Sequence, residues 1–479
     1  MVGLLVVGLL VVGCGGSVEA PPTPPPPHVL LLTVDTLRSD YLASHGYDLP
    51  TTPSIDRLLE GGVVFPHALS PVPRTTPALA SMLTGAYPHG TEVRSLTDPL
   101  GPGLATLAEV LGAAGYRTAA VVSNHVLVRE RGLDRGFEIY DAASDSRTAP
   151  ATTAAALAAA VGLAGGGGGA TSDPIFLWVH YIDPHVPYFP PPDLARAFDP
   201  GYEGPYAENF GSIVGGIGNQ AYPSDLPKIR AVFQNPLSDE VNAHVRRLYA
   251  ADVRATDDAI GALLAGLRTK LGNRWLVVFT ADHGEALGER SDFYYDHGDY
   301  VDQASLEVPL GFVLPPGDPR ARRAQLDTRV SLVDLAPTLA ELLGLRLPTE
   351  QVEGRSLAQW VVNQEEPGAP QPAPVFAESG TSFFPRQIAR RRDFSVAGRF
   401  RTVIVGDWKL VWTPGHTQPW ELFDLARDPL EKENLYYEGH PRAEELQRHL
   451  RRWFRDRPGT QQPPSPADVE RLRSLGYLP

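Results

Sequence analysis

Cysteine is almost absent from this chain: Cys14 is the only one among 479 residues. A single cysteine excludes an intramolecular disulfide and a zinc site built from several thiolates. An excess of positive charge is also missing, because 56 acidic residues outnumber 42 lysines and arginines and give a formal net charge of −14. Nucleic-acid binding depends on cationic contacts with phosphates, so this balance argues against it. An enzyme of this charge acting on anionic substrates would need a local positive centre, such as a metal ion.

Long hydrophobic runs are scarce too. Residues 4–12 are almost wholly apolar but too few to span a membrane. They end in Val11-Val12-Gly13-Cys14, which resembles the lipobox of bacterial lipoproteins, whose cysteine is acylated. The proline-rich residues 21–27 predict a semi-rigid tether after it. The alternative is an ordinary secretory signal with an incidental cysteine, and the lack of Lys or Arg in residues 1–3 leaves an upstream start open. We expect an exported protein, lipid-anchored through Cys14 at the periplasmic face or outer membrane of a bacterium.

Short apolar runs rich in branched residues predict buried strands of a parallel sheet. They cover residues 28–34, 117–122, 174–181 and 274–280. Polar side chains follow these runs directly, and ligands of open α/β sheets bind beyond the carboxyl ends of the strands. The side chains concerned are Asp35, Asp183, His185, Asp282 and His283. An adjacent aspartate and histidine, as at 282–283, can supply an oxygen and an imidazole nitrogen to one metal ion.

Each of these side chains also has a structural alternative. An aspartate after a strand often caps the next turn or helix. A histidine in a proline-rich loop, such as His185, is usually structural, and His297 taken alone is an ordinary surface histidine. Residues 400–412 predict a β-hairpin around Gly406-Asp407. Lys409 on this hairpin could reach over a cleft, although such a lysine is usually only solvated.

Residues 74–85 predict a short helix with a hydroxyl group at its start. Pro77 suits the first helical turn, and Gly85 suits the left-handed position just past the end. Thr75 would then lie at the helix N-terminus, among backbone N–H groups without intrahelical partners. Such a position attracts anions and favours a hydroxyl that becomes an alkoxide.

This layout resembles the active-site segment of the sulfatases in the alkaline phosphatase superfamily. Their pattern is a Cys or Ser nucleophile, a Pro two residues later, an Arg four residues later, and a helix closing on Leu-Thr-Gly. Counting back from Leu83-Thr84-Gly85 places the nucleophile at Thr75. Threonine excludes formylglycine, which sulfatases make from Cys or Ser, and the Arg position holds Leu79.

The resemblance extends from about residue 28 to residue 478, through Asp183-Pro184-His185-Val186-Pro187-Tyr188 and residues 352–357 and 422–435. It implies an α/β fold with a mostly parallel sheet flanked by helices and a smaller C-terminal α+β subdomain. We predict a signal and tether in residues 1–27, a catalytic domain in 28–363, and a subdomain with a small antiparallel sheet and a helix in 364–479.

The resemblance also implies roles for the residues singled out above. One divalent metal would be held by Asp35, Thr75, Asp282 and His283. Sulfatases often carry a second Asp where this chain has Thr36, and they more often have Asp-Asn than Asp-His at 282–283, the latter being the form of the superfamily's phosphoester enzymes. Zinc or manganese is therefore favoured, with calcium as an alternative. His185 and His297 would contact the anionic group of the substrate, and Asp183 and Lys409 would help to bind it.

These residues predict a metal-dependent hydrolase of sulfate, phosphate or phosphonate esters that works through a covalent threonine intermediate. Phosphorus is favoured on chemical grounds, because a threonine sulfate lacks the geminal-diol exit of formylglycine. The substrate would be an anionic ester, for instance on a glycan or a lipid headgroup. Two alternatives stay open. One is a transferase of phosphoethanolamine or phosphoglycerol, disfavoured because such enzymes have several membrane helices. The other is a lipid-tethered glycan-binding protein without activity.

Overall fold

The computed structural model describes residues 25–142, 147–165, 173–207, 238–290, 293–298, 300–362, 372–379, 400–413 and 418–453. The predicted lipobox with Cys14 and most of the tether lie outside the described residues, as does most of the predicted boundary around residue 364. Both remain predictions. Within the described part of the chain, no helix combines the length and the apolar character needed to cross a membrane.

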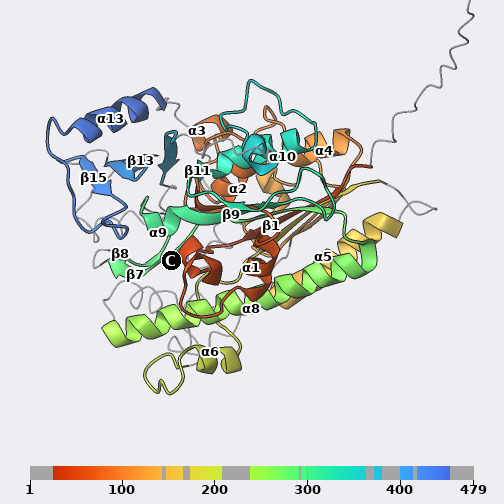
Figure 1. Cartoon of the computed structure of the whole chain (residues 1–479), viewed down its shortest axis with the longest axis horizontal. Coiled ribbons are helices and arrows are strands. Elements are labelled where there is room, and N and C mark those ends of the chain that lie inside the picture. Colours follow the sequence, from red (N-terminus) through yellow and green to blue (C-terminus); the bar gives the residue numbers. More distant parts are fainter. Residues whose placement is uncertain are drawn as a thin grey trace, which may run out of the picture.

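A nine-stranded sheet forms the centre of the molecule (Figure 1). Its order is β10-β2-β9-β6-β1-β5-β3-β4, with β11 also paired to β2. Every pair is parallel except those made by β9, which runs antiparallel to β2 and β6. The strands are β1 (His28–Val34), β2 (Val63–Leu69), β3 (Arg117–Val122), β4 (Ile139–Ala142), β5 (Ile175–Tyr181), β6 (Trp275–Ala281), β9 (Glu307–Val313), β10 (Ala324–Gln325) and β11 (Val330–Ser331).

The register of the three central strands brings their carboxyl ends level with one another. Val34 at the end of β1 pairs with Tyr181 at the end of β5 and with Ala281 at the end of β6. Strands β5 and β6 are buried along their whole length, as their apolar sequences predict for a sheet covered on both faces. The residues directly after these strands therefore meet at one edge of the sheet.

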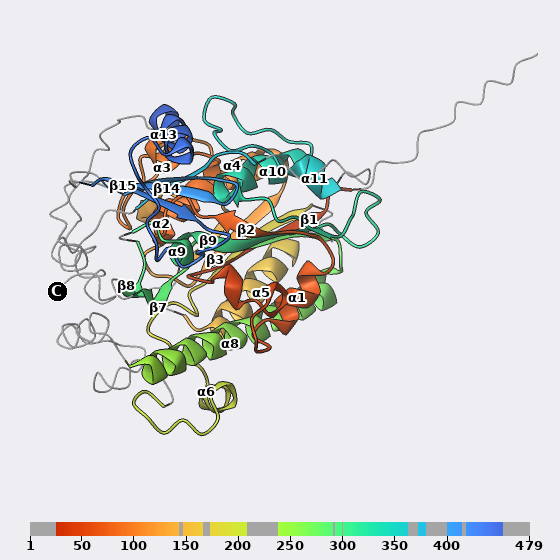
Figure 2. The ribbon, with the colours of Figure 1, turned by 60° about the vertical axis from the view of Figure 1, so that its left-hand side comes forward.

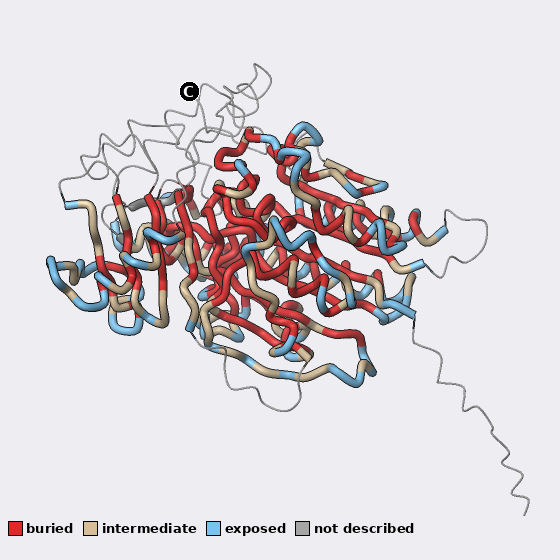
Figure 3. The backbone as a smooth tube through the Cα atoms, turned by 90° about the horizontal axis from the view of Figure 1, so that it is seen from above, coloured by how far each residue is buried: buried red, intermediate tan, exposed pale blue. Residues whose placement is uncertain are grey.

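Helices cover both faces of this sheet (Figures 1 and 2). One face carries α1 (Pro53–Leu59), α5 (Ala149–Gly165) and the long α8 (Asp239–Leu271), with α6 (Pro192–Phe198) packed on α8. The other carries α2 (Thr75–Thr84), α3 (Pro88–Thr91), α4 (Leu107–Ala113) and α10 (Leu335–Leu342). Figure 3 shows the buried residues concentrated in the layer between them. Short helices α9 (Gln303–Leu306) and α11 (Ala358–Val362) and the hairpin of β7 (Ala286–Arg290) and β8 (Phe293–Asp296) complete this part.

A second, smaller sheet lies to one side (Figure 1). Its antiparallel strands are β12 (Val375–Glu378), β13 (Arg401–Val405), β14 (Trp408–Trp412) and β15 (Trp420–Asp424). Helix α13 (Pro441–Trp453) packs on it through Ala443, Leu446 and Leu450. The predicted hairpin, the predicted C-terminal helix and the α/β class with a smaller antiparallel subdomain are thus confirmed.

Candidate active site

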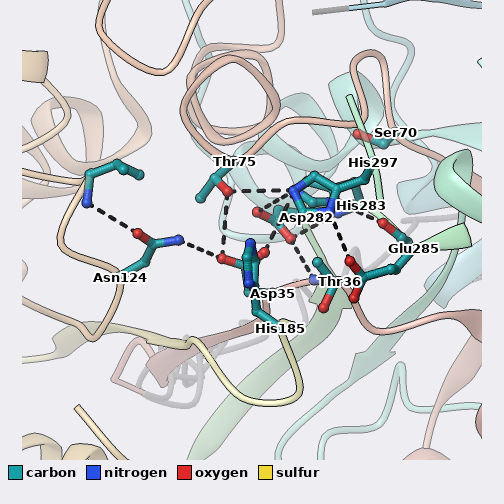
Figure 4. Close-up of polar contacts among 12 residues, drawn as sticks. Asp35, Thr36, Ser70, Thr75, Asn124, His185, Asp282, His283, Glu285 and His297 are labelled. Carbon is teal, nitrogen blue, oxygen red and sulfur yellow. Dashed lines mark hydrogen bonds and ion pairs between the residues drawn. The ribbon is translucent and has the colours of Figure 1, made fainter. Parts of the chain in front are cut away.

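Thr75 is the first residue of α2, as the sequence predicts. Arg74 before it is extended, with φ −151° and ψ 134°, and Gly85 ends the helix in the left-handed conformation. The Thr75 side chain is 1% exposed. Its Oγ1 lies 3.5 Å from Asp35 Oδ2 and 3.5 Å from His283 Nε2 (Figure 4). A hydroxyl at a helix N-terminus therefore faces a carboxylate and an imidazole that come from two other strands.

Asp35, Asp282 and His283 follow β1 and β6, whose ends are level, and all three are fully buried. His283 Nε2 lies 3.6 Å from Asp35 Oδ1 and 3.6 Å from Asp282 Oδ2. The backbone N–H of Thr36 donates to Asp282 Oδ1 over 3.3 Å. The four residues predicted as metal ligands are therefore brought together in one cluster.

Burial and mutual charge strongly perturb these groups. Burial raises the pKa of Asp282, and the charge of Asp35 raises it further. Burial also opposes the charged form of Asp35, but contacts with His180, His185 and His283 in their protonated forms outweigh it at low pH and hold the pKa of Asp35 below its ordinary value. The pKa of His283 is lowered by burial and then by His297 nearby, so its imidazole is neutral at neutral pH. A neutral imidazole is the form that binds a metal.

Two further residues of this cluster were not predicted from the sequence. Asn124, after β3, donates from Nδ2 to Asp35 Oδ2 over 2.7 Å and fixes that carboxylate. His180, the penultimate residue of β5, is fully buried, and its Nε2 lies 3.5 Å from Asp35 Oδ2. A histidine inside an otherwise apolar strand was the one available signal for His180. Asn124 gave no signal, because a polar residue after a strand is common.

The cluster fits a bound cation. One donor atom each from Asp35, His180 and Asp282 lies within 4.8 Å of the other two. Among the described residues, Asp35 Oδ1, Asp282 Oδ2 and His180 Nε2 are buried atoms without a hydrogen-bond partner. Buried polar atoms are normally paired, since leaving one unpaired costs about 1–3 kcal/mol. Two carboxylates and two imidazoles that face one another in a buried site form a donor set typical of a divalent metal.

His185 and His297 extend the cluster on the side of His283. The rings of His185 and His297 are 4.9 Å apart, and those of His283 and His297 are 4.5 Å apart. His297 Nδ1 lies 3.1 Å from Glu285 Oε1, and the Tyr188 hydroxyl donates to Glu285 Oε2 over 3.1 Å. Because Nδ1 of His297 is engaged by the fully buried Glu285, Nε2 is the atom through which His297 would reach a substrate.

Comparison with known proteins identifies the family. Residues 27–345, about two thirds of the chain, match the family described as Sulfatase. The chain belongs to the sulfatase family. Residues 288–457 match a domain described as N-sulphoglucosamine sulphohydrolase, C-terminal. An ulvan-active sulfatase of Formosa agariphila is 25% identical, over 93% of this chain and 84% of its own.

Solved structures confirm the sulfatase-like fold. A phosphonate monoester hydrolase of Agrobacterium radiobacter superposes with a TM-score of 0.69 at 21% identity, covering 89% of this chain and 94% of its own. A protein in complex with its substrate D-glucosamine-2-N,6-O-disulfate gives a TM-score of 0.67 at 18% identity, over 89% and 97% of the two chains. The family identifies this sulfatase-family protein as an ester hydrolase.

The position at which the sulfatase pattern has an Arg holds Leu79, which is fully buried in the core. A cationic side chain, that of Arg74, directly precedes Thr75 in the sequence. A Cβ atom added to Gly298 would collide with the guanidinium of Arg74, so this guanidinium passes directly over Gly298, beside His297. Arg74 is 3% exposed. The sulfatase-family protein thus has a buried arginine directly before Thr75 in the sequence, with its guanidinium against the residue that follows His297.

Two residues predicted to bind substrate have structural partners, and for the fully buried Lys409 this corrects the prediction. Lys409 is fully buried, and its Nζ lies 2.5 Å from Glu431 Oε1 and 2.5 Å from the carbonyl oxygen of Val301. Asp183 Oδ2 accepts a hydrogen bond of 2.8 Å from the backbone N–H of Ala149, the first residue of α5. Burial raises the pKa of Asp183 to about 6. Both side chains hold structural elements together.

Replacing Lys409 with methionine is therefore expected to destabilise the protein without weakening substrate binding. Glu431 would be left as an unpaired buried charge, which costs about 3–5 kcal/mol of unfolding free energy. Urea unfolding measures this loss, and the Lys409→Met/Glu431→Gln double variant should recover most of it. A rise in KM of the single variant at unchanged stability would instead restore Lys409 as a substrate ligand.

Proposed function

We propose that this sulfatase-family protein hydrolyses phosphate or phosphonate esters with Thr75 as the nucleophile. The observation that carries the proposal is the position of Thr75 Oγ1, at the start of α2 and 3.5 Å from both Asp35 Oδ2 and His283 Nε2. The helix N-terminus stabilises an alkoxide at this place. A positioned nucleophile splits one difficult displacement into two easier ones.

The chemistry of threonine favours phosphorus over sulfur. Thr75 would attack the ester centre in line, expel the alcohol, and form a threonine ester. Water then attacks the phosphorus of the phosphothreonine and breaks its bond to Oγ1. This step releases the phosphate and restores the threonine. A threonine sulfate would need attack at sulfur instead, because threonine cannot form the geminal diol through which formylglycine expels sulfate. The fold leaves the choice open, since it accommodates a phosphonate monoester hydrolase and sulfated-sugar enzymes alike.

Asp35, Asp282 and His283, together with Thr75 Oγ1, would hold one divalent cation. When bound, the cation supplies positive charge that lowers the pKa of the Thr75 hydroxyl and offsets negative charge on the transferred group. The nitrogen donor favours zinc or manganese over calcium. The identity of the metal remains a prediction.

The remaining residues would bind the transferred group. Arg74, next to Thr75 and over Gly298, would supply the cationic contact that Leu79 cannot. His297, held by Glu285 through Nδ1, and His185, whose ring lies 4.9 Å away, would donate hydrogen bonds to the non-bridging oxygens. One of them would protonate the leaving oxygen, a contribution of roughly 10²- to 10⁴-fold.

Sulfate ester hydrolysis is the second candidate, because the ulvan-active relative is named a sulfatase. Paired aryl phosphate, aryl phosphonate and aryl sulfate substrates with the same leaving group separate the two. We expect kcat/KM for the phosphorus esters to exceed that for the sulfate by at least about 100-fold, or 2.7 kcal/mol. A preference for the sulfate would contradict the proposed function and leave the family assignment intact.

A further inference from the structure

His180 occupies a place in the site that the predicted metal ligands do not account for. Its Nε2 is fully buried at the end of β5, lies 3.5 Å from Asp35 Oδ2, and has no hydrogen-bond partner in the described part of the chain. Asp35 and Asp282 are grouped with His180 as possible ligands of one metal ion, and their Oδ1 and Oδ2 atoms, respectively, also lack a hydrogen-bond partner. Three buried donor atoms that lack partners and face one another indicate a common ligand.

Thr33, on the other side of the ring, accommodates the tautomer that leaves a lone pair on Nε2. His180 Nδ1 lies 2.9 Å from Thr33 Oγ1, which also accepts from Trp178 Nε1 over 2.9 Å. The Thr33 hydroxyl can donate to the carbonyl oxygen of Val179, which lies 3.4 Å away. With two hydrogen bonds accepted and one donated, the Thr33 hydroxyl is satisfied when Nδ1 carries the imidazole proton. The hydrogen bond of one ring nitrogen sets which nitrogen is free to bind a metal.

The opposite tautomer fits the site less well. A proton on Nε2 would have to be donated to Asp35 Oδ2 across 3.5 Å, a length at which a hydrogen bond is weak. That oxygen already accepts a hydrogen bond of 2.7 Å from Asn124 Nδ2. Asn124 therefore holds Asp35 at a much shorter distance than His180 would as a donor.

We propose that His180 Nε2 is a direct ligand of the divalent cation, in place of the second carboxylate that Thr36 cannot supply. This inference deepens the proposed function, whose metal it concerns. The protein ligands become two carboxylates, Asp35 and Asp282, and two imidazoles, His180 and His283. Exchanging a carboxylate for an imidazole changes the metal preference of the site. Calcium prefers oxygen ligands, so the exchange favours zinc.

X-ray absorption of the zinc-loaded protein tests the proposal without any substrate. Wild type should show two imidazole nitrogens bound to zinc, and His180→Asn should show one. His244→Asn is the matched control, since His244 is equally buried but has both ring nitrogens engaged, by Asp199 and by the carbonyl oxygen of Tyr206. It should keep two. A single imidazole in wild type, or an unchanged count in a folded His180→Asn protein, would overturn the proposal.

Metal affinity gives a second readout, by competition with a chelator. His180→Asn should weaken zinc binding more than 100-fold, whereas a residue that only supports a ligand accounts for about 10- to 100-fold. Calcium binding should weaken less than zinc binding, and an equal loss for both would count against an imidazole ligand. If His180→Asn does not fold, the wild type and the His185→Asn and His297→Asn variants provide the test. Zinc should keep two imidazole ligands in each of them. These measurements can fail while Thr75-dependent hydrolysis stands, so the two proposals are separable.

Discussion

Thr75→Ala should lower turnover of an aryl phosphate by roughly 10⁴- to 10⁶-fold, as expected when a nucleophile is removed and only binding and electrostatic contributions are left. The reason is local: Oγ1 is the only hydroxyl that the N-terminus of α2 presents to both Asp35 and His283 among the described residues. Folding should be unaffected, because alanine fits the first turn of a helix. Steady-state and single-turnover kinetics measure the loss, with circular dichroism to verify the fold.

The adjacent Thr76 provides a matched control. It is also fully buried in the first turn of α2, but its hydroxyl donates to the carbonyl oxygen of Leu96 over 3.0 Å and has no part in the site. Thr76→Ala should cost about 1 kcal/mol of stability and leave kcat within a few-fold of wild type. Full turnover by Thr75→Ala, or an equal loss in both variants, would remove Thr75 from the mechanism.

Removing the metal should have the second large effect. Several kcal/mol of charge stabilisation would be lost, which corresponds to a fall in kcat of about 10³-fold or more. Dialysis against a chelator, followed by titration with zinc, manganese or calcium, measures the loss and its reversal. Restoration by zinc or manganese but not by calcium is the expected result. Full activity of protein verified to be free of metal would contradict the cation site.

Because Asp35 and Asp282 are buried together, the stability of the protein provides a further test of the metal site. The pKa of Asp282 is raised by burial and by Asp35, so its stabilising contribution is complete below the unfolded-state pKa and is lost as the pH rises through the folded-state value. At neutral pH this contribution to the stability of the metal-free protein is therefore reduced. Asp282→Asn should therefore stabilise the metal-free protein by roughly 1–3 kcal/mol and abolish the stabilisation that zinc gives wild type. Thermal unfolding with and without zinc checks both signs, and destabilisation in both states would contradict a metal role for Asp282.

The central part of the fold followed directly from the sequence. Buried parallel strands have nearly continuous apolar sequences, so residues 28–34 and 117–122 were predicted with the bounds that β1 and β3 have. The helix start at Thr75 and its end at Gly85 were marked by Pro77 and by the glycine, whose left-handed conformation is observed. Because strand ends meet at one edge of a parallel sheet, Asp35, Asp282 and His283 could be assigned to one cluster before their contacts were known.

The errors concern side chains whose partners lie far away in sequence. Lys409 was placed over the cleft, but its charge is neutralised by Glu431 in a loop that no local pattern connects to the hairpin. The role of Asp183 in substrate binding stays a prediction, and the sequence shows no sign of its contact with the start of α5, more than 30 residues earlier. His180 was missed because a strand pattern does not reveal which ring nitrogen Thr33 would engage. Pairing across elements depends on packing, which sequence periodicity does not encode.

The stereochemical course at phosphorus tests the central claim most directly. A phosphorothioate monoester made chiral at phosphorus with two oxygen isotopes is hydrolysed by the wild-type protein in water enriched in the third, and the configuration of the thiophosphate product is determined. Attack by Thr75 followed by attack of water comprises two in-line displacements, so the account predicts overall retention. Inversion would mean a single displacement by water, and it would contradict a threonine nucleophile.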